Sequence, residues 1–258
     1  MKKIFIDPGH GGDSIGASYK GRVEQDDCLN LALAVKKLLQ TQKGVEVMLS
    51  RETSVNPSLS NRCIQANNWG ADYFLSIHRN AFQPNKATGV ENWVYSKVSK
   101  QGDTYKKAET ILNYVCDATG FKNRGMKMGA PSYTDFAVNR ETNMSSCLLE
   151  LGFIDSDTDN AIFDKKFNEM AKSLAIGLME AVGETWSETT PDEDTTNSKM
   201  LYLVQIGAYE SKKSAEELKE QAIKAGFKDA FIRLSGDFDG DGKVTAADAQ
   251  KVLSKSVE

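Results

Sequence analysis

The chain has 258 residues, of which 40% are hydrophobic, and a formal net charge of -4 at pH 7, which is the composition of an ordinary soluble protein. This length allows either one large domain or a catalytic domain with small appendages. The sequence lacks a clustered excess of Lys and Arg and has no apolar run near the roughly 20 residues that span a bilayer, so we expect no nucleic acid or membrane partner.

Strand and helix signals alternate over residues 1–182. Strands are expected at 3–6, 45–49, 73–77, 89–95 and 145–150, and helices at 24–40, 59–69, 105–118 and 163–182. This alternation predicts a layered α/β domain in which helices cover both faces of a sheet. The runs that begin at Ile4 and Phe74 are apolar without alternation, as expected of strands covered on both faces.

Cysteine usage and the N-terminal residues indicate the compartment. The cysteines lie inside apolar patterns, too far apart for the CxxC knuckles of a zinc ribbon; they are Cys28, Cys63, Cys116 and Cys147. We expect buried, reduced thiols. Met1 runs directly into an apolar strand, which leaves no room for a secretory signal peptide, so we expect synthesis in the cytoplasm.

The two histidines both follow strand patterns that end in polar loops. His10 closes KIFIDPGHGG and His78 closes ADYFLSIHRN. Imidazole is the commonest protein metal ligand and a frequent acid or base near neutral pH. The alternative is a pair of unrelated loop histidines.

Two glutamates occupy comparable positions. Glu24 lies four residues before Cys28, on the apolar face of a predicted helix, where it would bind a ligand or simply complement the helix dipole. Glu150 ends the apolar run 147–149, and a buried acid is costly unless it is paired or coordinated. Its alternative role is an ion pair with Arg62 or Arg140.

An open α/β sheet keeps its functional sites at the edge where such strand ends meet. Two histidines and two carboxylates there have the composition of a catalytic zinc site, with three protein ligands and an open position for water. The HExxH pattern is absent, and spacing alone does not say which glutamate is the ligand and which is the base.

Polar and small residues flank both histidines. Arg79 and Asn80 would contact substrate or shape the loop. The pair Gly11 and Gly12 has no GxxxxGK signature or Rossmann fingerprint around it, so close backbone packing beside the metal is favoured over a phosphate cradle.

Four segments between residues 1 and about 182 resemble the successive motifs of the zinc-dependent N-acetylmuramoyl-L-alanine amidases, the amidase_3 family. They are FIDPGHGG, GRVEQ, ADYFLSIHRNA and CLLELGFIDS. Their order is most similar to that of sporulation autolysins of the CwlC and CwlV type and of related phage endolysins. The resemblance implies that His10, Glu24 and His78 bind Zn2+ and that Glu150 is the catalytic carboxylate. It also implies the reaction, hydrolysis of the amide between N-acetylmuramic acid and L-alanine in peptidoglycan.

The remainder of the chain predicts appendages. Residues 183–199 are acidic and rich in Thr, which is typical of a linker. Residues 200–235 are predicted to form a strand, a capped helix and a strand, a small α+β unit. They resemble one repeat of a SPOR domain, which is a cell-wall-binding module. The second repeat is missing. Either a homodimer supplies it, or the terminal segment completes the half-domain within one chain.

Residues 236–258 contain a loop with oxygen ligands at the spacing of a calcium site. The predicted Ca2+ ligand positions are Asp237, Asp239, Asp241, Lys243, Thr245 and Asp248. The loop resembles one repeat of a dockerin. Because two repeats normally make a dockerin, we expect local calcium-stabilised structure rather than cohesin binding.

Three functions compete at this point. The first is a zinc amidase that cleaves peptidoglycan, the second is a wall-binding protein with an inactive amidase domain, and the third is a zinc hydrolase of another amide. The intact set of His10, Glu24, His78 and Glu150 disfavours the second. Without a signal peptide, the protein would reach the wall through a phage holin or by lysis of a sporulating mother cell.

Overall fold

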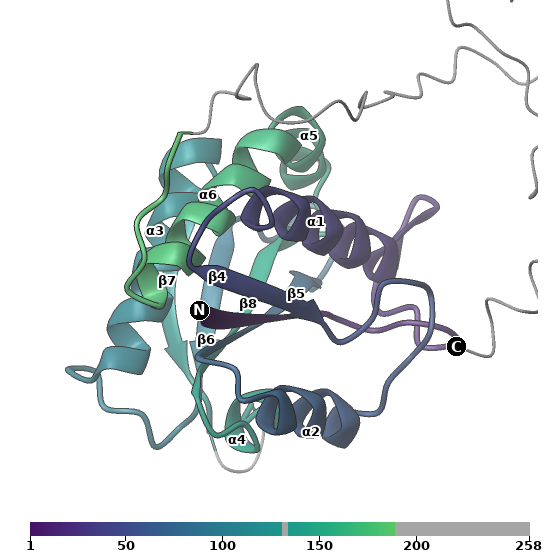
Figure 1. The fold of residues 1–258 in the computed structure, drawn as a ribbon. Coiled ribbons are helices and arrows are strands. Elements are labelled where there is room, and N and C mark those ends of the chain that lie inside the picture. The colour runs from purple at the N-terminus through teal and green to yellow at the C-terminus, as the bar shows by residue number, and fades with distance from the viewer. Residues whose placement is uncertain (131–133, 189–258) are drawn as a thin grey trace, which may run out of the picture. The chain divides into compact units, whose positions relative to one another are not determined.

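The computed structural model describes residues 1–130 and 134–188, which form a layered domain around one mixed sheet (Figure 1). The strands are β1 (Lys2–Pro8), β4 (Val45–Leu49), β5 (Tyr73–Asn80), β6 (Val90–Val94), β7 (Asn123–Met128) and β8 (Ser145–Phe153). They lie in the order β4-β1-β5-β8-β6-β7. Only the pairing of β6 with β8 is antiparallel in this sheet. The predicted α/β class is confirmed.

Helices cover both faces of the sheet, as the sequence predicts. On one face lie α1 (Glu24–Leu39), α3 (Asp103–Thr119) and α6 (Phe167–Ala181), which pack against one another (Figure 1). On the other face lie α2 (Leu59–Trp69) and the short α4 (Ala137–Arg140). The sheet is therefore buried on both sides where its central strands run.

The central strands divide their side chains between two hydrophobic clusters. Ile4 and Ile6 of β1 enter the larger cluster beneath α1, whereas Phe5 enters the smaller one. In β5, Leu75 joins the larger cluster and Phe74 stacks on Phe5, with ring centroids 5.4 Å apart. Successive side chains of a strand point to opposite faces, so a strand covered on both sides is apolar throughout.

Four short or polar elements are absent from the sequence prediction. The strand β7 lies at the edge of the sheet and reads NRGMKM, which has little apolar signal because its side chains remain half exposed. The helix α4 has four residues. The strands β2 (Ser18–Tyr19) and β3 (Arg22–Val23) form a two-residue hairpin. None of these is long enough or periodic enough to give a hydrophobic pattern.

The predicted helix at 163–182 begins earlier and is interrupted. In the structure α5 spans Asp157–Lys165, and α6 follows after Lys166. The Ser156 hydroxyl accepts a hydrogen bond from the Asp159 backbone nitrogen and caps α5. This cap precedes the first apolar residues of the helix, so periodicity alone placed the start too late.

The domain continues past the predicted boundary at residue 182. Trp186 packs against the larger cluster, and the Ser187 backbone nitrogen donates to Gln42 Oε1 at 2.9 Å. Residues 183–188 therefore belong to the domain rather than to a linker. The rest of the predicted linker, the SPOR-like segment 200–235 and the calcium loop 236–258 lie outside the described residues.

The thiol prediction is confirmed, since all four cysteines are buried and free. Among the described residues, no helix has the length and apolar character needed to cross a membrane.

Candidate active site

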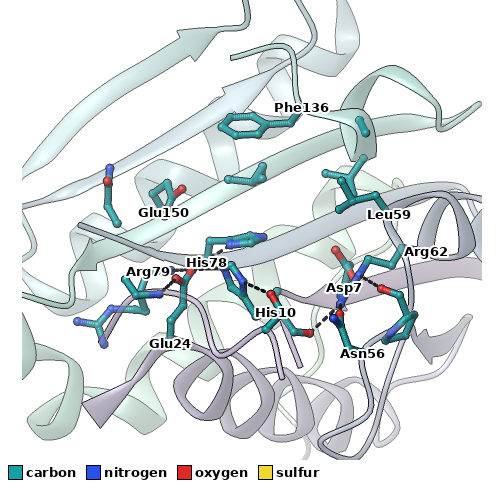
Figure 2. A pocket seen from close by; sticks show the side chains of 18 of the residues that line it. Asp7, His10, Glu24, Asn56, Leu59, Arg62, His78, Arg79, Phe136 and Glu150 are labelled. Atoms are coloured by element: carbon teal, nitrogen blue, oxygen red, sulfur yellow. Dashed lines mark hydrogen bonds and ion pairs between the residues drawn. The ribbon is translucent and has the colours of Figure 1, made fainter. Parts of the chain in front are cut away.

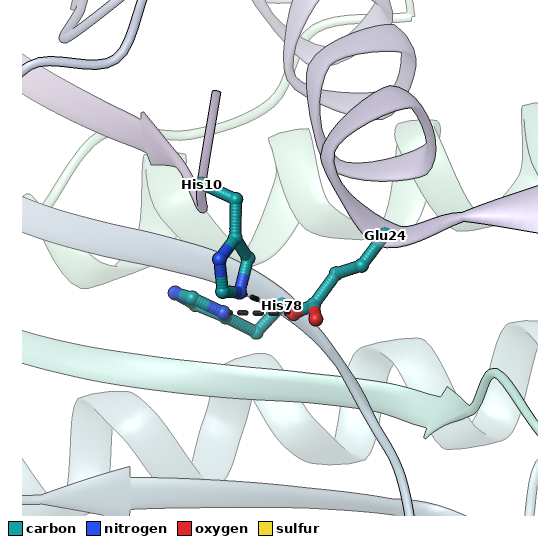
Figure 3. Close-up of side chains that lie close together, drawn as sticks. All are labelled: His10, Glu24 and His78. Carbon is teal, nitrogen blue, oxygen red and sulfur yellow. Dashed lines mark hydrogen bonds and ion pairs between the residues drawn. The ribbon is translucent and has the colours of Figure 1, made fainter. Parts of the chain in front are cut away.

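Three side chains of types that can hold a metal ion meet at the carboxyl edge of the sheet (Figure 3). His10 follows β1, His78 lies near the end of β5, and Glu24 is the first residue of α1. Glu24 Oε1 lies 3.1 Å from His10 Nε2 and 2.9 Å from His78 Nδ1. One ligand atom of each residue lies within 4.8 Å of the others. The structure thus brings together the three residues that the resemblance pairs with zinc.

Glu24 is held as an anion. Its carboxylate is buried and also accepts hydrogen bonds from the backbone nitrogens of Arg79, at 3.0 Å, and Ala17, at 2.8 Å. Burial opposes ionisation, but the hydrogen bonds to His10 and His78 outweigh it and hold the pKa of Glu24 well below its usual range. Its place between two imidazoles shows more than a helix-dipole role.

Glu150 lies on β8 in register with His78 on β5. Burial raises the pKa of Glu150 to about 7; His78 opposes this rise, and the Glu24 and Glu91 carboxylates add to it. Its Oε2 is buried and accepts no hydrogen bond from any described residue. This carboxylate stands apart from the three-ligand cluster and is free for another partner.

The alternative ion pair for Glu150 is wrong. Arg62 Nη1 bonds Asp7 Oδ1 at 2.6 Å, and Arg140 pairs with its neighbour Glu141 on the surface. Neither arginine reaches Glu150, because both are already committed to other carboxylates.

One pocket of about 640 Å³ is lined by all four predicted site residues, His10, Glu24, His78 and Glu150 (Figure 2). The ligand cluster and Glu150 form its polar side, and Leu59, Phe136 and Leu148 supply apolar surface. Leu59 is 60% exposed, so the pocket opens to solvent beside α2. A polar, titratable cluster beside an apolar wall is typical of an enzyme site.

Two arginines fix the loop that carries His10; the sequence analysis did not select Arg51, and it considered Arg62 only as a partner of Glu150. Arg51 donates to the carbonyls of Pro8, at 3.0 Å, and Gly9, at 2.7 Å. Arg62 donates to the carbonyls of Pro8, at 2.8 Å, and His10, at 2.7 Å. His10 has a φ of 60°, which is unusual for a residue with a side chain. These contacts support that conformation.

Arg62 is itself anchored by Asp7, which is 1% exposed and also accepts hydrogen bonds from Ser50 and Ser76. The sequence signal for this network is an aspartate at the end of the apolar run IFID. A buried carboxylate at that position requires a partner.

Glycines permit the close approach of this loop to the ligands. A Cβ at Gly9 would overlap the imidazole of His78, and one at Gly16, whose φ is 72°, would overlap the carboxylate of Glu24. Gly11 packs directly on the backbone of Val55. The predicted role of close packing is borne out for Gly11, and the contacts to the metal-ligand cluster come from Gly9 and Gly16.

Arg79 and Asn80 have different surroundings. The Arg79 guanidinium is fully buried between Asp27 and Asn160 and lies 4.2 Å from the centre of the Phe163 ring. These contacts fit the predicted role of shaping the loop, and Arg79 also contributes to the lining of the pocket, so substrate contact stays a prediction. Asn80 lines the pocket, and its amide donates to Glu91 Oε1 at 3.0 Å.

The Amidase_3 family profile, described as N-acetylmuramoyl-L-alanine amidase, matches residues 4–181. The chain belongs to this family. It is 39% identical over 237 residues to a sporulation-specific N-acetylmuramoyl-L-alanine amidase of Bacillus subtilis, covering 91% of this chain and 85% of that protein. An alignment of this length extends beyond the catalytic residues into the C-terminal part of the chain.

Solved amidase structures share the fold. An N-acetylmuramoyl-L-alanine amidase of Clostridium difficile 630 superposes with a TM-score of 0.63 at 33% identity, covering 69% of this chain and 95% of that one. The catalytic domain of CwlV from Bacillus (Paenibacillus) polymyxa gives 0.62 at 34% identity, covering 70% and 97%. The described domain therefore corresponds to a nearly complete amidase catalytic domain.

Proposed function

We propose that this amidase cleaves the bond between the lactyl group of N-acetylmuramic acid and L-alanine in peptidoglycan, with zinc held by His10, Glu24 and His78. The observation that carries the proposal is the convergence of these three ligands in one pocket with the buried, unbonded carboxylate oxygen of Glu150. Family membership gives the substrate class.

The donor set fits zinc. Two imidazole nitrogens and one carboxylate oxygen are ligands that catalytic zinc sites use, with one position left open. Glu24 Oε1 lies 2.9 and 3.1 Å from the two imidazole nitrogens, and one donor atom of each of the three residues lies within 4.8 Å of the others, so these residues would hold one ion together.

When bound, zinc supplies Lewis acidity toward the scissile carbonyl and toward water. Glu150 then takes a proton from the attacking water and delivers one to the leaving nitrogen, which yields a lactyl carboxylate and a free L-alanine amino group. A pKa raised toward neutrality suits both transfers. His10 and His78 are both occupied as ligands, so proton transfer falls to Glu150.

The competing functions differ in what they predict for the same residues. A wall-binding protein without activity needs no converging ligands and no unbonded acid, so the intact site favours an enzyme. A zinc hydrolase of another amide would use the same chemistry, and the match to the amidase family disfavours it.

End-group analysis of digested Gram-positive cell walls tests the reaction. The proposal requires new L-alanine amino termini to appear as the walls clear, without new reducing sugars. Glu150→Gln should retain one zinc per chain and lose activity, whereas Glu109→Gln, an exposed glutamate on α3, should retain both. Reducing sugars as the product would identify a glycosidase and refute the proposal.

We propose further that the C-terminal part binds the cell wall. The SPOR-like half-domain would be the binding unit, and the calcium loop would stabilise it locally. The alignment with the Bacillus subtilis amidase extends into this region, which supports a shared module. Calorimetry with millimolar calcium tests the loop: no heat of binding and no increase in thermal stability would contradict the assignment. A monomer mass that does not depend on concentration, in a chain with a folded tail, would exclude the homodimer.

A further inference from the structure

A second, smaller cavity adjoins the active site. Its volume is about 330 Å³, and its lining residues are Asn80, Ala81, Phe82, Lys86, Ala87, Glu91, Arg124 and Phe153. Asn80 and Ala81 also line the active-site pocket, so the two cavities share a wall two and three residues after the ligand His78. The second cavity is therefore a direct neighbour of the active site, and we call it the side pocket.

The side pocket presents positive charge. Arg124 donates from Nε to Glu91 Oε2 at 2.7 Å and stands 4.9 Å from the centre of the Phe153 ring. Its Nη2 has no hydrogen-bond partner among residues 1–130 and 134–188. Lys86 is exposed and forms no ion pair within the same part of the chain. Two cations thus face a cavity with one neighbouring carboxylate.

The carboxylate of Glu91 is already used. Glu91 is 4% exposed; its Oε1 accepts from Asn80 at 3.0 Å and from Trp93 at 3.2 Å, and its Oε2 accepts from Arg124. It neutralises part of the charge of Arg124 and fixes its orientation. Arg124 Nη1 donates to the Thr88 carbonyl at 3.4 Å, so the charge of Lys86 and the Nη2 donors of Arg124 stay available to a ligand.

The distance from Glu150, the proposed base, to the side pocket is short enough for a few residues of an extended peptide to span. Glu91 and Glu150 face each other on paired strands, a separation of about 4.5–5.5 Å between Cα atoms, and Arg124 is bonded to Glu91. An extended peptide advances about 3.3–3.6 Å per residue. Two or three residues of a peptide are enough to connect the scissile bond with Arg124.

We propose that the side pocket binds the free α-carboxylate of the D-glutamate, the second residue of the stem peptide, through Lys86 and Arg124, and so selects substrates by the charge at that residue. This inference rests on the proposed function. Once the lactyl carboxyl group is consumed in the amide, the sugar chain of the substrate is neutral, whereas the peptide bears carboxylates. Charge complementarity therefore places the peptide, on the leaving-group side, in the cationic side pocket.

Two soluble substrates test the proposal: N-acetylmuramoyl-L-Ala-γ-D-Glu-L-Lys and the same compound with D-isoglutamine, in which the free α-carboxylate is an amide. The zinc-loaded full chain should cleave the acid form with a kcat/KM about tenfold higher, as expected for a charge-assisted contact. Lys86→Gln should lower kcat/KM severalfold for the acid form and leave the amide form unchanged. Lys37→Gln, which removes an exposed charge near the far end of α1, should change neither.

Arg124 provides a second variant. Arg124→Lys keeps the charge and should keep the preference, whereas Arg124→Gln should abolish it. If Arg124→Gln does not fold, Lys86→Glu decides, because it should invert the preference. If the enzyme cleaves both substrates at equal rates and no variant changes these rates, the inference is wrong and the amidase reaction still stands. If Lys86→Gln slows the cleavage of walls that carry teichoic acid but does not slow the cleavage of the soluble substrates, the bound anion is a polymer phosphate and the inference is wrong. Failure to cleave either substrate overturns the proposed function itself.

Discussion

Glu150 and His78 occupy paired positions on the adjacent strands β8 and β5. Paired residues of parallel neighbours point to the same face of a sheet, so the free carboxylate lies beside a ligand imidazole without joining the ligand cluster. Glu24 differs because it reaches the cluster from the start of α1 and lies between both histidines. The two glutamates thus have different surroundings: Glu24 lies between both imidazoles, and Glu150 lies beside one of them.

Loss of the anionic ligand should remove the metal. Glu24→Gln keeps the size of the side chain but removes the charge that His10 and His78 share. We expect zinc affinity to fall by more than about 100-fold, since even partners outside the ligand set are worth 10–100-fold. Competition with a chromophoric chelator measures the affinity. Glu109→Gln serves as the control, and an unchanged affinity in Glu24→Gln would contradict the ligand assignment.

Activity should decline on the acid side of neutrality. Glu150 accepts a proton only when ionised, so kcat/KM falls about tenfold per pH unit below its pKa. Burial places that pKa at about 7 in the metal-free protein, and a nearby cation lowers it. The acid limb of the profile should therefore lie at or below about pH 7. A limb well above pH 7 in the zinc-loaded enzyme would assign the titration to another group.

Arg62 should matter for stability and for the His10 loop. Arg62→Met leaves the carboxylate of Asp7 buried without its cation, which costs about 3–5 kcal/mol. Urea denaturation of the metal-free protein measures the free energy of unfolding. Arg140→Met removes an exposed pair with Glu141 and should cost at most about 1 kcal/mol. Equal effects of the two substitutions would contradict the role of the buried pair of Arg62 and Asp7 in stability.

Arg79 should act on folding and not on substrate binding. Arg79→Met retains apolar contact with Phe163 but removes a buried partner of Asp27, so we expect a loss of about 3 kcal/mol. Arg22, the other partner of Asp27, moderates this loss. The folded fraction should keep its KM, which kinetic assays at low temperature measure. A raised KM with unchanged stability would support the substrate role.

The orientation of the Arg79 side chain could have been predicted from strand geometry. Arg79 follows His78 within β5, and neighbouring side chains of a strand point to opposite faces. If His78 faces the metal cluster, Arg79 has to face the other way, toward α1 and Phe163. The buried end of IFID similarly predicts a partner for Asp7. The sequence does not predict which arginine pairs with Asp7, because Asp7 and Arg62 are 55 residues apart.

The sequence by itself determined the α/β alternation, the doubly covered strands and the buried thiols, because burial patterns are local properties of the chain. It also supplied the candidate site residues, whose roles came from the resemblance of four motifs to the amidase family. Tertiary structure alone decided the rest. It placed the Glu24 carboxylate between the two imidazoles and left Glu150 Oε2 without a hydrogen bond from the described residues. It also paired Arg62 with Asp7 and set a cationic side pocket beside the site. These relationships join residues distant in sequence, and only the packing of strands and helices fixes the distances between them.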